Sequence, residues 1–230
     1  MKKGLIYKIS AAISGISGII ILFAVIYPIV NYQKESNQKY PQLISPLVGY
    51  EASSQGVEKL DYTRASNWFA GGASREEFIS TNISFYTISI PRLKIKSATV
   101  AIGGEDLSKN LVQYPGTALP GRPGNSVIFG HSVLPIFFNP EDYISIFSTL
   151  PSLKAGDEIK VEYDGVSFKY RVESLFEIYP SDIQVLEQDT SDSFLSLVTC
   201  VPPGDPRMPK RLIVRARIVS LKEANAPFGN

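Results

Sequence analysis

The residues that most often carry enzyme chemistry are scarce in this chain of 230 residues, which contains one cysteine and one histidine. A single cysteine cannot form a disulfide within the chain, so a disulfide framework is excluded. The scarcity also leaves one way to pair a cysteine with a histidine. Cys200 ends an apolar run, and His131 lies in the stretch Gly130-His131-Ser132. By this count alone, a reactive thiol and a buried, inert cysteine remain equally open.

Charge is absent from residues 9–30. Such a run, at about 1.5 Å per residue, is long enough to cross a hydrocarbon core of about 30 Å. Lys2, Lys3 and Lys8 precede it, and positive flanking charge predicts a cytoplasmic N-terminus for residues 1–8. No small-x-small cleavage site follows, which favours an uncleaved transmembrane anchor over a signal peptide. We therefore expect a single-pass protein of the cell membrane whose remaining residues are extracellular.

A strong excess of charge of either sign is also lacking, since 23 basic residues stand against 22 acidic ones. All the acidic residues follow residue 30, together with 20 of the basic ones, so the exported part carries about −2. Nothing in this balance indicates a nucleic-acid partner. The acidic residues within 180–193 could suit calcium, but a solvated loop is the simpler interpretation. No metal and no cofactor are expected.

Short β-type runs dominate the chain after a polar stretch, residues 31–82, which we interpret as a stalk or linker. Asp164-Gly165 predicts a type I′ hairpin turn between two of these runs. Seven or eight strands in about 140 residues favour an all-β fold, a closed or nearly closed β-barrel with short helices in its connections. A polar tail occupies residues 222–230. The expected strands are 85–90, 98–102, 125–130, 157–163, 166–179, 194–200 and 211–219.

Cys200, His131 and Arg211 all fall at ends of these runs, where a rigid strand can position a site. A cysteine attacks through its thiolate, and a nearby histidine or arginine favours that form. Histidine can then protonate a leaving amine, and arginine can stabilise an oxyanion. The three side chains suffice for acyl transfer from an amide. No acidic residue stands in a motif that would orient the histidine, so a Cys-His-Asp triad is not supported.

These motifs resemble those of the sortases, which are membrane-anchored cysteine transpeptidases of bacterial surfaces. The resemblance rests on Thr199-Cys200, on Arg211 before Leu-Ile-Val, and on Gly130-His131-Ser132. It extends to a first strand ending in Ile-Pro at residue 91, to residues 114–126 before the histidine, and to Leu-Lys-Ala-Gly-Asp at 153–157. The match covers residues 83–221, the expected catalytic domain. It implies an eight-stranded sortase-type β-barrel.

The resemblance also implies roles for single residues. Cys200 would attack the Thr–Gly bond of a Leu-Pro-x-Thr-Gly-like sorting signal and form a thioacyl-enzyme. His131 would act as general acid and base, and Arg211 would position the substrate and stabilise the oxyanion. Thr199 and Ser132 would bind substrate. The implied partners are surface proteins that carry the sorting signal and an amine acceptor, either a cell-wall precursor or a pilin lysine.

Several alternatives stay open. Arg207 is a rival to Arg211, which lies 11 residues after Cys200. A hydrolytic or a pilin-polymerising variant would use the same chemistry, although the Asp-Pro-aromatic lid and second membrane segment of the polymerising type are missing. Trp68, in the expected stalk, is a candidate lid residue. An L,D-transpeptidase is disfavoured because no Ser-x-Gly-Cys precedes the thiol. A non-catalytic, membrane-tethered peptide-binding barrel is the alternative from a different class.

Overall fold

The computed structural model describes residues 2–220 apart from 42–60, 80–82 and 208–209. The expected tail at 222–230 and much of the expected stalk therefore lie outside the described residues. The chain divides into two compact units, Met1–Lys39 and Tyr40–Asn230. Each unit is described by itself below.

The first unit is one helix, α1 (Lys2–Lys39). Its part from Tyr7 onward is long and apolar enough to cross a membrane, with a mean hydropathy of 2.5 in its most apolar window. The helix continues beyond the expected span of residues 9–30 into residues 31–39, a polar stretch in which the Gln, Lys and Glu residues favour helix. There Glu35 accepts hydrogen bonds from Asn31 and Lys39, each four residues away and each 2.8 Å long. Such contacts stabilise a solvated helical turn.

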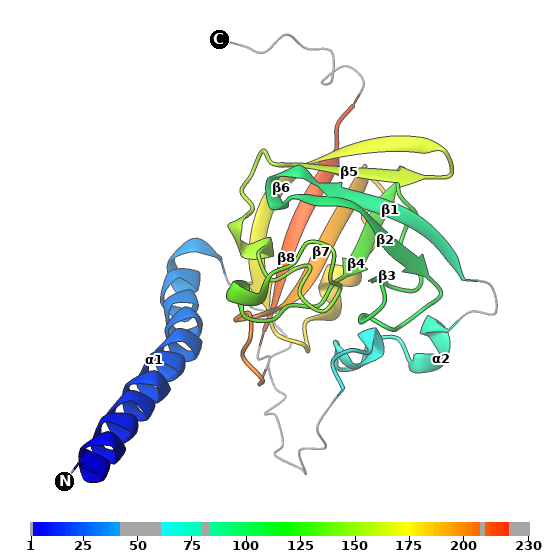
Figure 1. Cartoon of the computed structure of the whole chain (residues 1–230). Helices are drawn as coiled ribbons and strands as arrows, with labels where there is room; N and C mark the ends of the chain where they lie inside the picture. Colours follow the sequence, from blue (N-terminus) through cyan, green and yellow to red (C-terminus); the bar gives the residue numbers. More distant parts are fainter. Residues whose placement is uncertain (1, 42–60, 80–82, 208–209, 221–230) are drawn as a thin grey trace. The chain divides into compact units, whose positions relative to one another are not determined.

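The second unit contains a closed barrel of eight strands in the order β1-β2-β3-β4-β7-β8-β6-β5 (Figure 1). This confirms the predicted fold class. The strands are β1 (Ser84–Ile90), β2 (Ile95–Ile102), β3 (Leu111–Gln113), β4 (Gly124–Phe129), β5 (Glu158–Tyr163), β6 (Val166–Ile178), β7 (Ser193–Val201) and β8 (Lys210–Ile218). Four single 3₁₀ turns lie in the connections: η2 (Pro91–Leu93), η3 (Pro135–Phe137), η4 (Leu150–Ser152) and η5 (Ile183–Leu186).

Most strand pairs are antiparallel, whereas β2–β3 and β4–β7 are parallel. The predicted hairpin joins β5 to β6, with positive φ at both Asp164 (50°) and Gly165 (73°). Because side chains alternate along a strand, one set from every strand faces the barrel interior. That set includes the fully buried Ile88, Val100, Leu111, Ile128, Leu197 and Val214.

Seven or eight strands were expected from the sequence, and β3 was not among the seven that were placed on it. It has three residues, too few to show an alternating pattern. Its position is set by its neighbours, since Val100 pairs with Leu111 and Val112 pairs with Phe129. A strand this short is stabilised by the pairing on its two sides rather than by its own sequence.

Residues 61–79, called the cover segment below, lie against the barrel, although the sequence suggested a stalk here. The segment holds η1 (Ala65–Asn67) and α2 (Arg75–Phe78) and is drawn in cyan in Figure 1. Trp68 and Phe78 are buried within it. β4 and β7 are buried at every position, because one face of each lines the barrel interior and the other contributes to a cluster shared with the cover segment.

Candidate active site

Cys200 is the penultimate residue of β7, and its backbone pairs with that of Arg211 on β8. Directly opposed residues of antiparallel strands project their side chains from the same face. Cys200 and Arg211 are therefore neighbours on the face of the wall that points away from the barrel interior. Each is 1% exposed. The cysteine is both near the guanidinium and shielded from water.

His131 follows β4 and is tied to β7 by three hydrogen bonds. The amide of Gly130 donates to the carbonyl of Val198 (3.1 Å), and the Thr199 hydroxyl donates to the carbonyl of Gly130 (2.9 Å). On the other side of the histidine, the Ser132 hydroxyl donates to the carbonyl of Cys200 (2.8 Å). The backbone on both sides of His131 is thus attached to the strand end that carries Cys200.

The close approach at this point depends on glycine. A Cβ atom on Gly130 would lie 2.3 Å from Cδ2 of Phe147 and 2.7 Å from Cδ2 of Leu111. Both neighbours are fully buried, so neither side chain has room to move away. Glycine therefore sets how near the strand that precedes the histidine can come to the barrel core.

The histidine ring is oriented by the backbone of the next residue, Ser132. The amide of Ser132 donates to Nδ1 of His131 over 2.8 Å, so the neutral ring carries its proton on Nε2. The carbonyl oxygen of Ser132 also lies 3.2 Å from Nδ1, where it can accept a hydrogen bond from the Nδ1–H of the imidazolium. Burial lowers the pKa of His131, opposed by this backbone contact and by the negative charges of Asp61 and Asp142.

Burial raises the pKa of the Cys200 thiol to about 11, and the positive charge of Arg211 acts in the opposite direction. The histidine pKa moves down while the cysteine pKa moves up. In this closed arrangement the resting pair is therefore a neutral thiol and a neutral imidazole at neutral pH. Exposure to water would favour the thiolate. It would remove the effect of burial, which is larger than the opposing effect of the Arg211 charge.

Arg211 lies beneath the cover segment. Its Nε and Nη2 atoms donate to the carbonyl oxygen of Trp68 over 3.2 and 2.9 Å, and Nη1 donates to the carbonyl of Lys210. Arg207, the rival candidate, has a side chain that is 71% exposed and paired with Asp205. The structure thus brings Arg211, and not Arg207, beside Cys200.

The cover segment is the part of the site that sequence reasoning assigned to the stalk. Trp68 was considered there as a candidate lid residue, and the structure buries it in one apolar cluster with Cys200. The available signal was a single tryptophan in a polar stretch. A full cluster was not visible in the sequence, because its members come from six separate segments. They are Ala65, Trp68, Phe69, Phe78, Leu107, Val112, Tyr114, Val127, Phe129, Ile178, Val185, Val198, Cys200 and Ile213.

The three aspartates of the 180–193 loop have separate partners. Asp182 accepts from the amide of Tyr179, Asp189 from that of Ser191, and Asp192 pairs with Arg217. Within the described part of the chain, no group of three or more His, Cys, Asp or Glu residues is placed to hold a metal ion.

Known proteins share this fold and sequence pattern. The Sortase domain family matches residues 88–219. Sortase A of Bacillus anthracis is 24% identical over 231 residues, an alignment that covers 96% of this chain and 99% of that protein. Two solved structures are each 28% identical. For a Clostridium perfringens Sortase D5 transpeptidase the TM-score is 0.50, and the alignment covers 59% of this chain and 79% of the C. perfringens chain. A lid mutant of Sortase A from Corynebacterium diphtheriae has a TM-score of 0.52, and the alignment covers 63% of this chain and 75% of the C. diphtheriae chain.

The barrel, the cysteine beside an arginine and the family pattern define the class as β-barrel cysteine transpeptidases. The family match spans more than half of the chain. This chain belongs to the sortase family.

Proposed function

We propose that this protein is a cell-surface transpeptidase that cleaves a Leu-Pro-x-Thr-Gly-like sorting signal and transfers the acyl group to an amine. The observation that carries the proposal is the cross-strand pairing of Cys200 with Arg211, beside a histidine tied to the same strand end. A nucleophile, a proton carrier and a fixed positive charge are the groups that acyl transfer from an amide requires.

In the first half of the reaction, the thiol proton of Cys200 passes to His131. The thiolate then attacks the carbonyl carbon of the signal's threonine, and Arg211 stabilises the resulting oxyanion. As the C–N bond breaks, the imidazolium gives its proton to the departing glycine nitrogen. The product is a thioester on Cys200 and a free amine.

In the second half, an amine acceptor attacks the thioester carbon. His131 takes a proton from the attacking nitrogen, the C–S bond breaks, and the Cys200 thiolate leaves and recovers its proton from the imidazolium. A cell-wall precursor or a pilin lysine supplies the amine. Water in the same position would instead release the free acid, which is the hydrolytic alternative.

We propose that Thr199 and Ser132 serve substrate binding indirectly, by fixing the backbone beside His131. Thr199 alternates with Cys200 along β7, so its side chain lies on the barrel-interior face, where it is 0% exposed, and Ser132 is 2% exposed. The hydrogen bonds that their hydroxyls donate to backbone carbonyls hold the chain on both sides of His131 against β7.

We further propose that α1 anchors the protein in the cell membrane with Lys2, Lys3 and Lys8 on the cytoplasmic side. The barrel then lies outside the cell, where surface proteins and wall precursors are found. The apolar window of the helix supports the anchor, and the flanking lysines support the orientation.

The test uses the full-length chain in detergent, a Leu-Pro-x-Thr-Gly peptide, and triglycine as the amine. We expect cleavage and a peptide–triglycine product, with both lost in Cys200→Ala and His131→Ala. Arg207→Ala is the matched control for Arg211→Ala and should keep its activity. Cleavage that persists in Cys200→Ala would overturn the mechanism. Equal release of free acid with and without triglycine would favour a hydrolase, and no cleavage across a peptide library would favour the binding barrel.

A further inference from the structure

Three carboxylates are buried in the described part of the chain, those of Glu105, Glu177 and Asp205. A carboxylate that leaves water loses its hydration, and the loss is tolerated where a cation and hydrogen-bond donors replace the water. Each of the three therefore has a partner that fixes its position. What each pair holds in place depends on which segments it joins.

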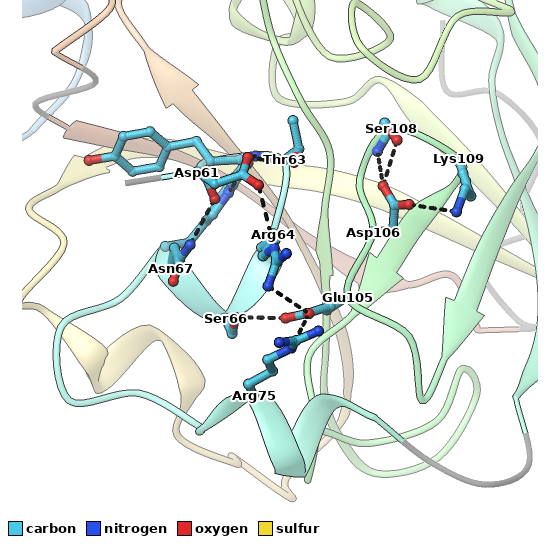
Figure 2. Close-up of polar contacts among 12 residues, drawn as sticks. Asp61, Thr63, Arg64, Ser66, Asn67, Arg75, Glu105, Asp106, Ser108 and Lys109 are labelled. Atoms are coloured by element: carbon cyan, nitrogen blue, oxygen red, sulfur yellow. Dashed lines mark hydrogen bonds and ion pairs between the residues drawn. The ribbon is translucent and has the colours of Figure 1, made fainter. Parts of the chain in front are cut away.

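Two of the three carboxylates hold segments away from β7 and β8. Glu105, in the loop after β2, accepts from the Ser66 hydroxyl over 2.7 Å and from Nε of Arg75 over 2.8 Å. Figure 2 shows both donors converging on this carboxylate from the cover segment. Asp205 pairs with Arg207, which lies in the same loop, over 2.6 Å. Neither carboxylate connects two strands of the barrel.

Glu177 does connect two strands, and it does so behind the proposed active site. It lies on β6, is 2% exposed, and accepts from Nζ of Lys210, the first residue of β8, over 3.0 Å. Glu177 is paired with Leu212, so it and Lys210 are diagonal neighbours on one face of the sheet. Arg211 alternates with Lys210 and projects from the other face, together with Cys200.

The ion pair holds a strand end that has few other restraints. The backbone of Lys210 pairs with that of Val201 on β7, and its Nζ lies 5.8 Å from the centre of the Tyr179 ring. Terminal residues of a strand open locally at little cost in free energy. The contact with Glu177 ties this terminal residue to β6 as well, so the start of β8 is fixed between both neighbouring strands.

The backbone of Lys210 passes this restraint to Arg211. Its carbonyl oxygen accepts from Nη1 of Arg211 over 3.2 Å. A guanidinium is planar and its donors form a rigid fork, so holding one nitrogen restricts the orientation of all of them. A shift of about 1 Å in a group that acts on the transition state can cost about 100-fold in rate. The position of Lys210 therefore matters to the chemistry assigned to Arg211.

We propose that Glu177 and Lys210 are positioning residues for Arg211: their ion pair fixes the first residue of β8, whose carbonyl orients the guanidinium toward the oxyanion. The pair acts through Arg211 and not on the substrate, because it lies on the opposite face of the wall from Cys200. The inference rests on the proposed function, since that function assigns the oxyanion to Arg211.

The first test measures peptide cleavage by the full-length chain in detergent. In Lys210→Met, we expect kcat for a Leu-Pro-x-Thr-Gly peptide to fall about tenfold with KM nearly unchanged, because the oxyanion forms only in the transition state. Glu177→Gln/Lys210→Met leaves no buried charge unpaired and should show the same fall in a stable barrel. Lys210→Arg restores the cation and should stay within about twofold of the wild type.

Glu158→Gln is the matched control for the ion pair. Glu158 also pairs with a lysine across two strands, Lys169 at 3.3 Å, but the two side chains are 40% and 42% exposed. The pair lies on β5 and β6 and not at the start of β8. Its loss should leave kcat and KM unchanged.

The second test is a double-mutant cycle that separates positioning from a general loosening of the barrel. If the pair acts through the guanidinium, adding Lys210→Met to Arg211→Lys should change kcat by less than about twofold. The same cycle is measured on alkylation of Cys200 by iodoacetamide, which needs no peptide. Lys210→Met should make alkylation about twofold faster when Arg211 is present, and should have no effect in Arg211→Lys.

The outcomes separate this inference from the proposed function. A wild type that cleaves no Leu-Pro-x-Thr-Gly peptide would refute the proposed substrate, and the alkylation cycle would still test the positioning of Arg211. Cleavage by the wild type with an unchanged kcat in Lys210→Met and in the double variant would overturn the positioning and leave the transpeptidase in place. Equal effects of Lys210→Met in both backgrounds would also overturn it. Urea denaturation of each variant verifies that the barrel is folded.

Discussion

The wall of the site, made of β4, β7 and β8, and the cover segment are held in different ways. The wall strands have continuous hydrogen-bonded registers, and every residue of β4 and β7 is buried. The cover segment has two helical pieces of three and four residues, and a few polar contacts attach it. Continuous registers open cooperatively, whereas discrete contacts can open locally. The wall is thus the rigid base that positions Cys200, and the cover segment helps to shield it from water.

Arg211 joins the two regions, so changing it has the largest expected effect. Arg211→Lys keeps the charge but loses the fork of donors, and we expect kcat/KM for the sorting peptide to fall by about 100-fold. Alkylation of Cys200 should rise in the same variant, because the Trp68 carbonyl loses both donors. Arg207→Lys should change neither quantity. If the cleavage rate and the alkylation rate both fall, the substitution has disturbed the folded barrel, and Arg211 does not have separate roles in catalysis and in holding the cover segment.

Gly130→Ala breaks the wall without touching the cover segment. The added Cβ would meet Phe147 and Leu111, both fully buried, and we expect the free energy of unfolding to fall by about 2 kcal/mol. Urea denaturation followed by circular dichroism measures it. Gly104→Ala is the control, since its Cβ would meet Ala101 at an ordinary 3.5 Å. Equal stability of the two variants would mean that the strand before His131 is not tightly packed.

Trp68→Phe weakens the cover and leaves the wall intact. The variant loses part of the stack on Phe129 and the hydrogen bond to Tyr62, and we expect alkylation of Cys200 to become about fivefold faster. The urea midpoint of the barrel should change little. A midpoint that falls in proportion to the alkylation rate would show that the two regions unfold as one unit.

The pH dependence of alkylation gives the smallest and most specific effect. Burial disfavours the thiolate, so the wild-type rate should keep rising above the ordinary thiol pKa of about 8.5. In Trp68→Phe, which loses packing in the cluster that contains Cys200 while Arg211 remains, we expect the midpoint to move to lower pH. A stopped-flow or mass-spectrometric pH series measures this. Identical midpoints in both proteins would contradict burial by the cover as the cause of the raised pKa.

The strands that are long enough to alternate were predictable from the sequence, and β3 was not. The hairpin at Asp164-Gly165 was predictable because positive φ is a local preference of those two residues. The three residues of β3 were missed because their strand character comes from pairing with β2 and β4. In the same way, the burial of Trp68 was missed because its partners lie on strands far along the chain.

For the candidate site too, the local sequence indicated which residues are involved, but not how they are arranged. The identities of Cys200 and His131 followed from their being unique, and the preference for Arg211 over Arg207 followed from the apolar strand that it opens. Their geometry did not follow. The attachment of the backbone beside His131 to β7 through Thr199 and Ser132 joins residues about 70 positions apart, and no local pattern encodes it.

The sequence by itself determined the apolar N-terminal helix, the barrel class and the candidate catalytic residues, because each depends on local composition, short-range periodicity or a unique residue. The tertiary structure alone decided that Cys200 is buried, that its pKa is raised, and that Arg211 binds the carbonyl of Trp68. Burial and long-range hydrogen bonds depend on which distant segments meet in space. A stretch that is polar and irregular in sequence thus becomes the segment that shields the site.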